Sequence, residues 1–473
     1  MRGRHRTLAA AAGILLAAGI GPAAAETLTQ ALAYAYQTNP QLLAQRALLR
    51  STDEQVPQAL SNWRPTVTFT GNIGAEVNGT AAQDPIFLVP NPVTGPHSSR
   101  NQTTTLRPNL VELELSQPVY RGGRTEAQTA EAIDTVQSTR AQTLAVETAV
   151  FQSVAQAYLD CVRDQTLLEV NRNNEQVLRK QLEATQDRFR VGEVTRTDVA
   201  QAESSLAQAT ATRIASEGQL ASSRAEYTAA VGHPPGRLLQ PRERPALPAT
   251  RAEALGLAAN NNPNVISAIY AERAARDNVA VVRGQLLPQI SLVGTVSRGY
   301  DQAATDKGLL AQSAQVEAEM TMPLYEGGAI YSQTRQAEQT VGQKRSLVDQ
   351  ARRSAVQSAT QAWETLISDR ASIASFAAAV RAAQIALEGT EQEALVGSRT
   401  VLDVLIAEQQ VFTTQSQLVV SQHDTALQEY NLAADTGRLI APELRLPVKL
   451  YDMERHYKAV KDKWLGFGGG LKE

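Results

Sequence analysis

The sequence predicts a mainly α-helical fold with a smaller share of β-structure, built as a duplicated unit in which two strands precede a very long helix. Three features indicate this fold class. Short motifs recur in the same order in both halves of the chain, four stretches alternate between apolar and polar residues, and two long stretches contain no proline. Such recurrence is typical of repeat architectures and outweighs local signals.

The recurring motifs divide the chain into two copies. The distance in sequence between matched motifs changes once, between the two alternating stretches of each copy. The loop that joins these two stretches must therefore be longer in the first copy. We expect a first repeat over residues 26–240, a second over 241–440 and a C-terminal tail over 441–473. The matched motifs are Asn39-Pro40 with Asn262-Pro263, Pro65 with Pro288, Pro118–Gly123 with Pro323–Gly328, Val191-Gly192 with Val396-Gly397, Asp198-Val199 with Asp403-Val404, and Gly232 with Gly437.

The alternating stretches predict strands with one apolar and one polar face, because successive side chains of a strand point to opposite sides. The first copy has an unbroken strand over 66–77 and a partner over 111–116, joined by a loop over 78–105. The second copy has strands over 290–297 and 316–322, joined by a shorter loop over 301–313.

The proline-free stretches predict helices over 124–190 and 329–395, each on the order of 100 Å long at 1.5 Å per residue. Helical patterns over about 27–62 and 251–286 precede the strands. Further helices over about 195–231 and 399–436 follow the Val-Gly breaks, and Val404, Val411 and Leu418 show the seven-residue spacing of coiled coils.

The N-terminal segment 1–25 predicts a cleaved signal peptide. Arg2, Arg4 and Arg6 provide the positive region, Leu8–Ile20 a short apolar run, and Ala23–Ala25 the small residues that a signal peptidase needs. We expect cleavage after Ala25. The apolar run is too short to span a membrane comfortably as a helix.

Composition excludes several classes of function. The net charge of −3 gives no indication of nucleic-acid binding, and the single cysteine, Cys161, allows no internal disulfide. No helical histidine pair for a metal and no phosphate-binding glycine loop is present. We therefore expect no enzyme activity, no cofactor and no metal site.

The strands indicate a membrane pore. They are about ten residues long, as is needed to cross a bilayer when tilted, and they are apolar on one face and polar on the other. Only helices and closed barrels can span lipid, and natural barrels begin at roughly eight strands. The four strands of one chain are too few to close such a barrel, so several subunits would have to contribute strands to one barrel. A soluble periplasmic coiled-coil scaffold carrying two hairpins is the alternative.

Four separated tracts of the chain carry a family resemblance. They are Tyr120–Gly123, Gln181–Glu183 with Arg188–Gly192 and Thr197–Val199, Gly397–Leu405, and Leu450–Asp452 with Tyr457 and Lys463-Trp464. These tracts resemble the TolC family of outer-membrane export channels, and the last of them, in the tail, resembles members linked to type I secretion. The resemblance covers the whole chain after the signal segment and implies a homotrimer with a twelve-stranded transmembrane barrel in the outer membrane and a twelve-helix coiled-coil tunnel through the periplasm.

The resemblance also implies partners and a gate. An inner-membrane ABC or proton-driven transporter and a periplasmic adaptor would supply the energy that the channel itself lacks. Gln181, Thr197 and Asp198 match one side of the links that hold the family's periplasmic tip shut, and Glu391 and Arg399 match the other. Asp403 matches an acidic ring at the entrance. Two positions depart from the pattern: Ala394 replaces a linking tyrosine and Ile406 replaces a second acidic residue. Asp198 and Asp403 could equally cap their helices.

A second candidate site lies on the polar strand faces. Glu112, Glu114, Glu317 and Glu319 precede Pro118 and Pro323, and we expect them to form an acidic band inside the periplasmic end of the barrel. A merely solvated polar face is the alternative interpretation.

The main competing hypothesis is a periplasmic adaptor, which also uses long helical hairpins. An adaptor would carry one hairpin between paired lipoyl-like halves, whereas this sequence has two units of hairpin and strand.

Overall fold

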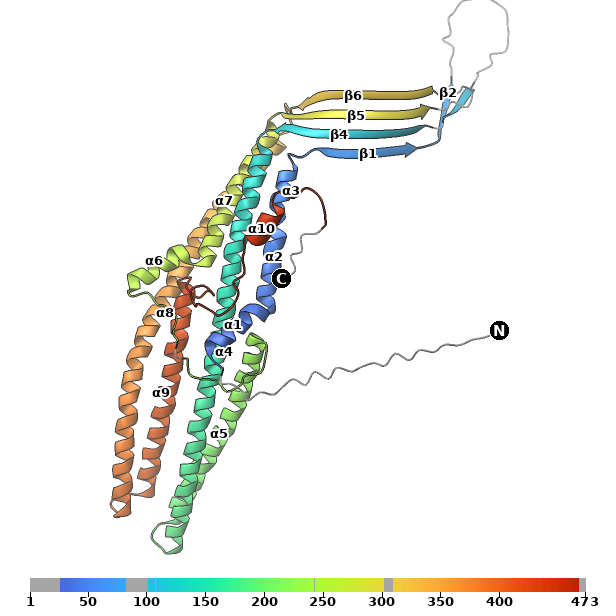
Figure 1. Ribbon diagram of the computed structural model, residues 1–473. Coiled ribbons are helices and arrows are strands. Elements are labelled where there is room, and N and C mark those ends of the chain that lie inside the picture. The colour runs from blue at the N-terminus through green and yellow to red at the C-terminus, as the bar shows by residue number, and fades with distance from the viewer. Residues whose placement is uncertain (1–25, 82–100, 107, 242, 302–308, 468–473) are drawn as a thin grey trace, which may run out of the picture. The chain divides into compact units, whose positions relative to one another are not determined.

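The computed structural model describes residues 26–81, 101–106, 108–241, 243–301 and 309–467 (Figure 1). The predicted signal peptide lies outside these residues. The chain divides into two compact units, which comprise residues 1–45, 144–262 and 354–450, and residues 46–143, 263–353 and 451–473. We call them the tip unit and the sheet unit. None of the described helices combines the length and the apolarity that crossing a membrane requires.

The two long helices match their predicted limits. Helix α4 spans Arg124–Arg190 and α8 spans Ala329–Leu395, and each has 67 residues. The helix α5 (Arg196–Val231) follows α4, and α9 (Val401–Asp435) follows α8. The predicted limits hold because glycines end the helices, as the tip turns show below.

The shorter helices before each pair of strands are broken at the repeated Asn-Pro motif. In the first copy they are α1 (Leu28–Thr38), α2 (Pro40–Asp53) and α3 (Gln55–Ser61). The second copy has α6 (Arg251–Asn261), α7 (Pro263–Arg283) and a 3₁₀ turn over Gly284–Leu286. Proline opens α2 and α7 because the first turn of a helix needs no backbone N–H from it. The Asn39 side chain accepts hydrogen bonds from the backbone of Gln41 and Leu42.

Four strands of the sheet unit form one antiparallel sheet in the order β1-β4-β5-β6 (Figure 1). They are β1 (Thr66–Ile73), β4 (Asn109–Arg121), β5 (Gln289–Asp301) and β6 (Leu309–Thr321). Three of them are longer than the sequence predicted, because β4, β5 and β6 pair far beyond the alternating residues. The loop predicted over 301–313 is correspondingly shorter, since β6 begins at Leu309.

The predicted unbroken strand over 66–77 is wrong. Strand β1 ends at Ile73, and β2 (Glu76–Ala81) pairs with β3 (Asn101–Leu106) in a separate hairpin within the predicted loop. The break lies where Gly74 donates its backbone N–H to the carbonyl of Pro108 at 2.9 Å. Proline has no N–H to return, so the regular ladder cannot continue there.

The same local chemistry builds both turns at the ends of the long helices. Gly192 and Gly397 have φ values of 83° and 81°, which glycine adopts without strain. The N–H groups of Glu193 and Ser398 bond back to the carbonyls of Arg188 and Glu393, at 2.9 and 3.0 Å. This is the Schellman pattern that ends a helix.

The two turns lie close together in the tip unit. Leu178 of α4, Ala202 and Ala209 of α5, and Val401 and Leu405 of α9 form one apolar cluster, in which each of these side chains is at most 6% exposed. The cluster joins the beginnings of α5 and α9.

A buried polar network ties three helices of the tip unit together. His423 of α9 is 5% exposed, and its Nε2 and Nδ1 atoms lie 2.9 Å from Asp160 and from Asp424 respectively. Arg163 pairs with Asp160 at 2.6 Å and with Asp164 at 2.7 Å. The Ser223 hydroxyl of α5 donates to Asp164. Because each charge has a partner, the network can stay buried between α4, α5 and α9.

The network makes stability dependent on pH. Burial alone would lower the pKa of His423, but its hydrogen bonds to Asp160 and Asp424 outweigh burial, and the pKa is raised. The protonated ring therefore stabilises the fold fully below the ordinary histidine pKa of about 6.5, and this contribution is lost as pH rises through the raised pKa. The network thus stabilises the tip unit most in mildly acidic solution.

We predict that His423→Gln lowers the thermal unfolding temperature more at about pH 5.5 than at about pH 9. Circular dichroism of the detergent-solubilised protein would measure the unfolding temperature at each pH. His233→Gln is the control, since that side chain is 32% exposed and should not reproduce the pH-dependent difference. A gap between wild type and His423→Gln that stays constant with pH would contradict the ion-pair assignment.

Candidate functional site

Each turn at the tip carries one ion pair, and the two pairs have opposite polarity. Arg188 Nε lies 3.1 Å from Glu193 Oε2, and Arg399 Nε lies 2.8 Å from Glu393 Oε2. Arg188 and Glu393 occupy equivalent positions near the ends of α4 and α8. A cation there is favoured by the helix dipole and an anion is not, so Glu393 depends more on its partner.

Arg399 and Asp403 are held in their charged forms. The hydrogen bond from Arg399 to Glu393, together with the Glu393 charge, raises the pKa of the guanidinium. Hydrogen bonds from the backbone and hydroxyl of Thr400, at 2.9 and 2.8 Å, lower the pKa of Asp403, and the Arg399 charge adds to this. Both side chains are therefore charged at neutral pH.

Asp198 and Asp403 both cap helices, as the alternative interpretation expected. Asp198 accepts hydrogen bonds from the N–H and hydroxyl of Thr195, each at 2.8 Å. Thr195 and Thr400 in turn accept from the backbone N–H of Asp198 and Asp403, which completes a capping box at the start of α5 and of α9. Capping does not exclude a second role, because each carboxylate is only partly covered.

The remaining candidate latch residues surround these turns. Gln181 is half-buried on α4, while Thr197 and Glu391 are exposed. Within the described part of this single chain, no hydrogen bond or ion pair links Arg399 to Gln181, Thr197 or Asp198. Arg399 instead bonds to Glu393, a residue that the sequence did not single out.

Glu408 is a tip residue that sequence reasoning missed. Its side chain is 5% exposed, and one carboxylate oxygen has no hydrogen-bond partner among the described residues. Burial, followed by the charge of Glu391, raises its pKa to about 7. The signal was available: Val401, Val404, Leu405 and Glu408 follow the i, i+3, i+4, i+7 spacing of a buried helix face.

The two departures from the family pattern differ in exposure. Ala394 is 8% exposed and packs within the tip, whereas Ile406 is 59% exposed and Leu402 is 46% exposed. The first turns of α9 therefore present apolar side chains beside the Asp403 carboxylate.

The register of the sheet puts all four candidate lumen carboxylates on one face. Glu112 and Glu114 lie opposite Ser297 and Thr295 of β5, while Glu317 and Glu319 lie opposite Val293 and Ser291 of the same strand. Directly paired residues point to the same side of a sheet. The four partners in β5 are every second residue of that strand and therefore point to one side of the sheet. The four carboxylates opposite them share that face.

The carboxylates are staggered along the strands rather than level with each other. Glu112 and Glu114 lie nearer the hairpin end of β4, because that strand continues past Pro118 to Arg121. Glu317 and Glu319 lie near the end of β6 that leads to α8. The four carboxylates thus form a staggered acidic patch along one face of the sheet, and the band at the periplasmic end of a barrel stays a prediction.

The opposite face of the sheet is apolar and exposed. Phe69, Leu113 and Val296 are directly paired across β1, β4 and β5, and they are 69%, 46% and 57% exposed. Apolar patches of this extent mark contact with a partner or a membrane. The same face carries Val67, Val111, Leu115, Leu292, Val316 and Met320.

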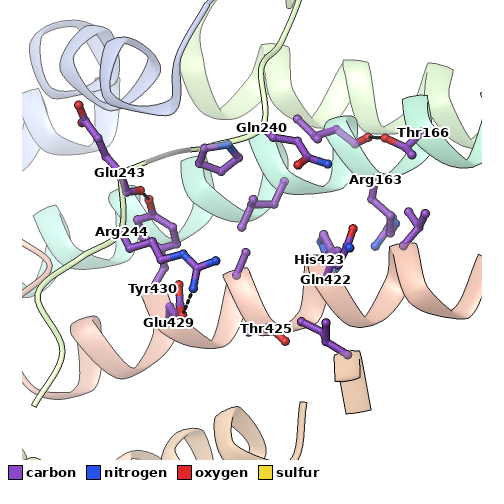
Figure 2. Close-up of a pocket in the computed structure, with 16 residues that line it drawn as sticks. Arg163, Thr166, Gln240, Glu243, Arg244, Gln422, His423, Thr425, Glu429 and Tyr430 are labelled. Atoms are coloured by element: carbon purple, nitrogen blue, oxygen red, sulfur yellow. Dashed lines mark hydrogen bonds and ion pairs between the residues drawn. The ribbon is translucent and has the colours of Figure 1, made fainter. Parts of the chain in front are cut away.

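A cavity of about 310 Å³ lies in the tip unit between α4, α9 and the segment before α6 (Figure 2). Its charged lining is already paired: Glu429, which is 1% exposed, bonds to Arg244 at 2.9 Å and to Arg370 at 2.8 Å. Arg163 and His423 belong to the buried network. These pairs connect the segment to α9, so we assign the cavity a structural role. In the described ranges, no group of three or more acidic, histidine or cysteine side chains is arranged to hold a metal ion.

Comparisons with known proteins agree with this architecture. The family profile described as outer membrane efflux protein matches residues 31–233 and 254–438. The chain is 35% identical over 460 residues to the outer membrane efflux protein BepC of Brucella suis biovar 1, covering 96% of each chain. It is 26% identical over 423 residues to the outer membrane protein TolC of Vibrio cholerae, covering 88% of this chain and 91% of the other.

Among solved structures, the Campylobacter jejuni CmeC outer membrane channel superimposes with a TM-score of 0.73 at 14% identity, covering 92% of this chain and 89% of that one. At this identity the likeness shows the fold. Proteins of the matched family are channels rather than enzymes, and family membership sets aside the scaffold and adaptor hypotheses. The duplicated helical hairpins, the two-faced sheet and these matches together show that the chain belongs to the outer membrane efflux protein family, as a TolC-family export channel of the outer membrane that extends into the periplasm.

Proposed function

We propose that three copies of this chain pool their sheets into one transmembrane barrel of twelve strands, three times the four of each sheet. One observation carries the proposal: β1 and β6 each have a single strand neighbour among the described strands, in a sheet whose outer face is apolar. In lipid, an open edge would leave backbone N–H and C=O groups unpaired, at several kcal/mol for each group. Pairing β1 of one copy with β6 of the next satisfies both edges.

The helices that follow the strands would then form the periplasmic tunnel. Each chain contributes α4 with α5 and α8 with α9, so three chains supply twelve helical segments. The small and polar residues of these helices suit close packing around a watery interior. The family matches to 31–233 and 254–438 support the division into repeats over 26–240 and 241–440, with a tail over 441–473.

The gate would lie at the turns of the tip unit. Asp403 repeated around the three-fold axis would concentrate cations at the entrance, and Arg399 of the second copy would bond to groups of the first copy, such as Asp198 and Gln181. Hydrogen bonds and ion pairs between these side chains act only at short range. Replacing a single one of the side chains should therefore be enough to loosen the closed gate. A protonated Glu408 beneath this ring would let the buried α8–α9 interface remain packed near neutral pH.

Transport through the channel requires partners. We propose that a periplasmic adaptor docks on the tunnel and that an inner-membrane ABC or proton-driven transporter supplies the energy. The homotrimer and outer-membrane lipid complete the assembly. The exported substrate would be selected by the transporter, since the tunnel itself offers a polar wall rather than a specific pocket.

We predict that Arg399→Ser raises single-channel conductance in planar bilayers, because it removes the proposed latch cation. Glu393→Gln is the matched control: it breaks the ion pair within the turn but leaves Arg399 available to a neighbouring helix. An unchanged conductance for Arg399→Ser, or an equal rise for both variants, would rule out a latch between helices.

We also predict that Asp403→Asn lowers the preference of the pore for cations without unfolding the tip, because asparagine can still cap a helix. Reversal potentials across a salt gradient measure the preference. Asp198→Asn is the control, because it removes the same charge from the same kind of capping box on α5. Equal losses from the two variants would contradict an entrance lined by the second copy rather than by both copies alike.

Replacement of Glu112, Glu114, Glu317 and Glu319 together by glutamine should reduce the same cation preference further, since it removes the acidic patch from the proposed lumen. Variants with glutamine at 112 and 114 only, or at 317 and 319 only, would show how much each pair of carboxylates contributes to the preference. Reversal potentials unaffected by all four substitutions would show that the polar face is merely solvated.

A further inference from the structure

The C-terminal segment of the sheet unit is fixed along the helices that lead into β1. Helix α10 spans Arg455–Val460, and its residue Tyr457 packs on the cluster of Val56, Ala132 and Val136. The guanidinium of Arg140 lies 5.2 Å from the centre of the Tyr457 ring. Figure 1 shows α10 and the chain that follows it, in dark red, beside α2 and α3.

Arg64 holds the end of this segment at the start of β1. Its Nη1 donates a hydrogen bond to the carbonyl of Lys463 at 2.7 Å, and its guanidinium lies over the Trp464 ring, 4.8 Å from the centre. Only Pro65 separates Arg64 from Thr66, the first residue of β1. Trp464 is therefore held level with the first residues of the sheet.

The side chains beyond this clamp are apolar and exposed. Trp464 is 65% exposed, Leu465 is 90% exposed and Phe467 is fully exposed. Exposure of three such side chains to water is unfavourable, because the removal of apolar surface from water is favourable. Basic residues precede them at Lys458, Lys461 and Lys463.

We propose that Trp464, Leu465 and Phe467 insert into the periplasmic leaflet of the outer membrane, at the boundary between phospholipid headgroups and acyl chains. Tryptophan is enriched at this boundary, and an exposed apolar segment beside lysines is the pattern of interfacial anchors. The lysines would lie among the anionic headgroups.

Position determines the choice of lipid over another partner. The apolar face of the sheet begins with Val67, three residues after Arg64, so the level at which Trp464 is held is the level at which lipid contact begins. Through Arg64, the exposed segment is thus tied to the start of the strand that carries this apolar face. The anchor requires a sheet that spans the membrane, which is part of the proposed function.

The anchor would fix the depth of the channel. The apolar band of a closed barrel sets its depth only through the cost of hydrophobic mismatch, whereas a segment held at one boundary adds a restraint at a defined level. The cation–π contact and the carbonyl hydrogen bond of Arg64 transmit that restraint to β1.

The test uses full-length protein in phospholipid vesicles, in a Cys161→Ala background, with an environment-sensitive fluorophore on a single introduced cysteine. For Phe467→Cys we expect a blue-shifted emission, quenching by lipids that carry a nitroxide near the headgroup, and protection from aqueous iodide. Ala459→Cys, on the exposed side of α10, is the control and should be quenched by iodide. Quenching of both labels by iodide alike would overturn the proposal.

Two further variants separate the anchor from the proposed function. Val296→Cys, on the apolar face of β5, should be quenched by lipid if the sheet spans the membrane, and its failure would contradict the proposed function itself. Lipid quenching at residue 296 with protection of residue 467 from both quenchers would overturn the lipid anchor in favour of a contact with a second copy of the chain. Arg64→Gln should reduce the lipid quenching at residue 467, whereas a tail that inserts without the clamp would be unaffected.

Discussion

The pairing of backbone groups in lipid is the constraint on which the rest of this architecture depends. The four-stranded sheet of the described residues has two open edges, and each edge needs a partner strand within a bilayer. In the proposed barrel several copies would close the sheet around one axis. Because β4 and β6 lead into helices of 67 residues, the same axis would then also arrange the helices. The duplication supplies two hairpins of each kind from every chain.

The two copies keep the same backbone chemistry at the tip but differ in their charges. Both turns use a glycine in the left-handed region and a Thr-Asp capping box. The ion pairs beside these turns are reversed, with Arg188 at the position that Glu393 occupies in the other copy. Local geometry is thus the same in the two copies because the chain must reverse direction at both places. The side chains that surround the turns are free to diverge, and the two turns therefore carry different ion pairs.

Buried polar groups connect the helices at two levels of the tip unit. The network of Asp160, His423 and Arg163 satisfies its charges internally, which keeps α4 and α9 in a fixed register. Glu408 lies in an apolar interface without such a partner for one oxygen among the described residues, and its raised pKa allows it to remain neutral there. The first arrangement compensates its charges by pairing, whereas the second depends on the protonation of a single carboxylate.

The sequence by itself determined the duplication, the family and the limits of the long helices, because glycine pairs and Val-Gly breaks are local signals that act on the backbone directly. It also determined that the strands have two faces, since alternation depends only on the pleat. Tertiary structure decided where the strands end, because pairing with β5 extends β4 past Pro118 and the Gly74–Pro108 contact interrupts β1.

Tertiary structure alone also decided the partners of the charged residues. Arg399 pairs with Glu393, and Glu408 is buried, because of how the helices are rotated about their axes. The four glutamates are staggered because of the register of the strands. No single stretch of sequence encodes helix rotation or strand register. The same is true of Trp464, whose position beside Arg64 brings together residues from opposite ends of the chain.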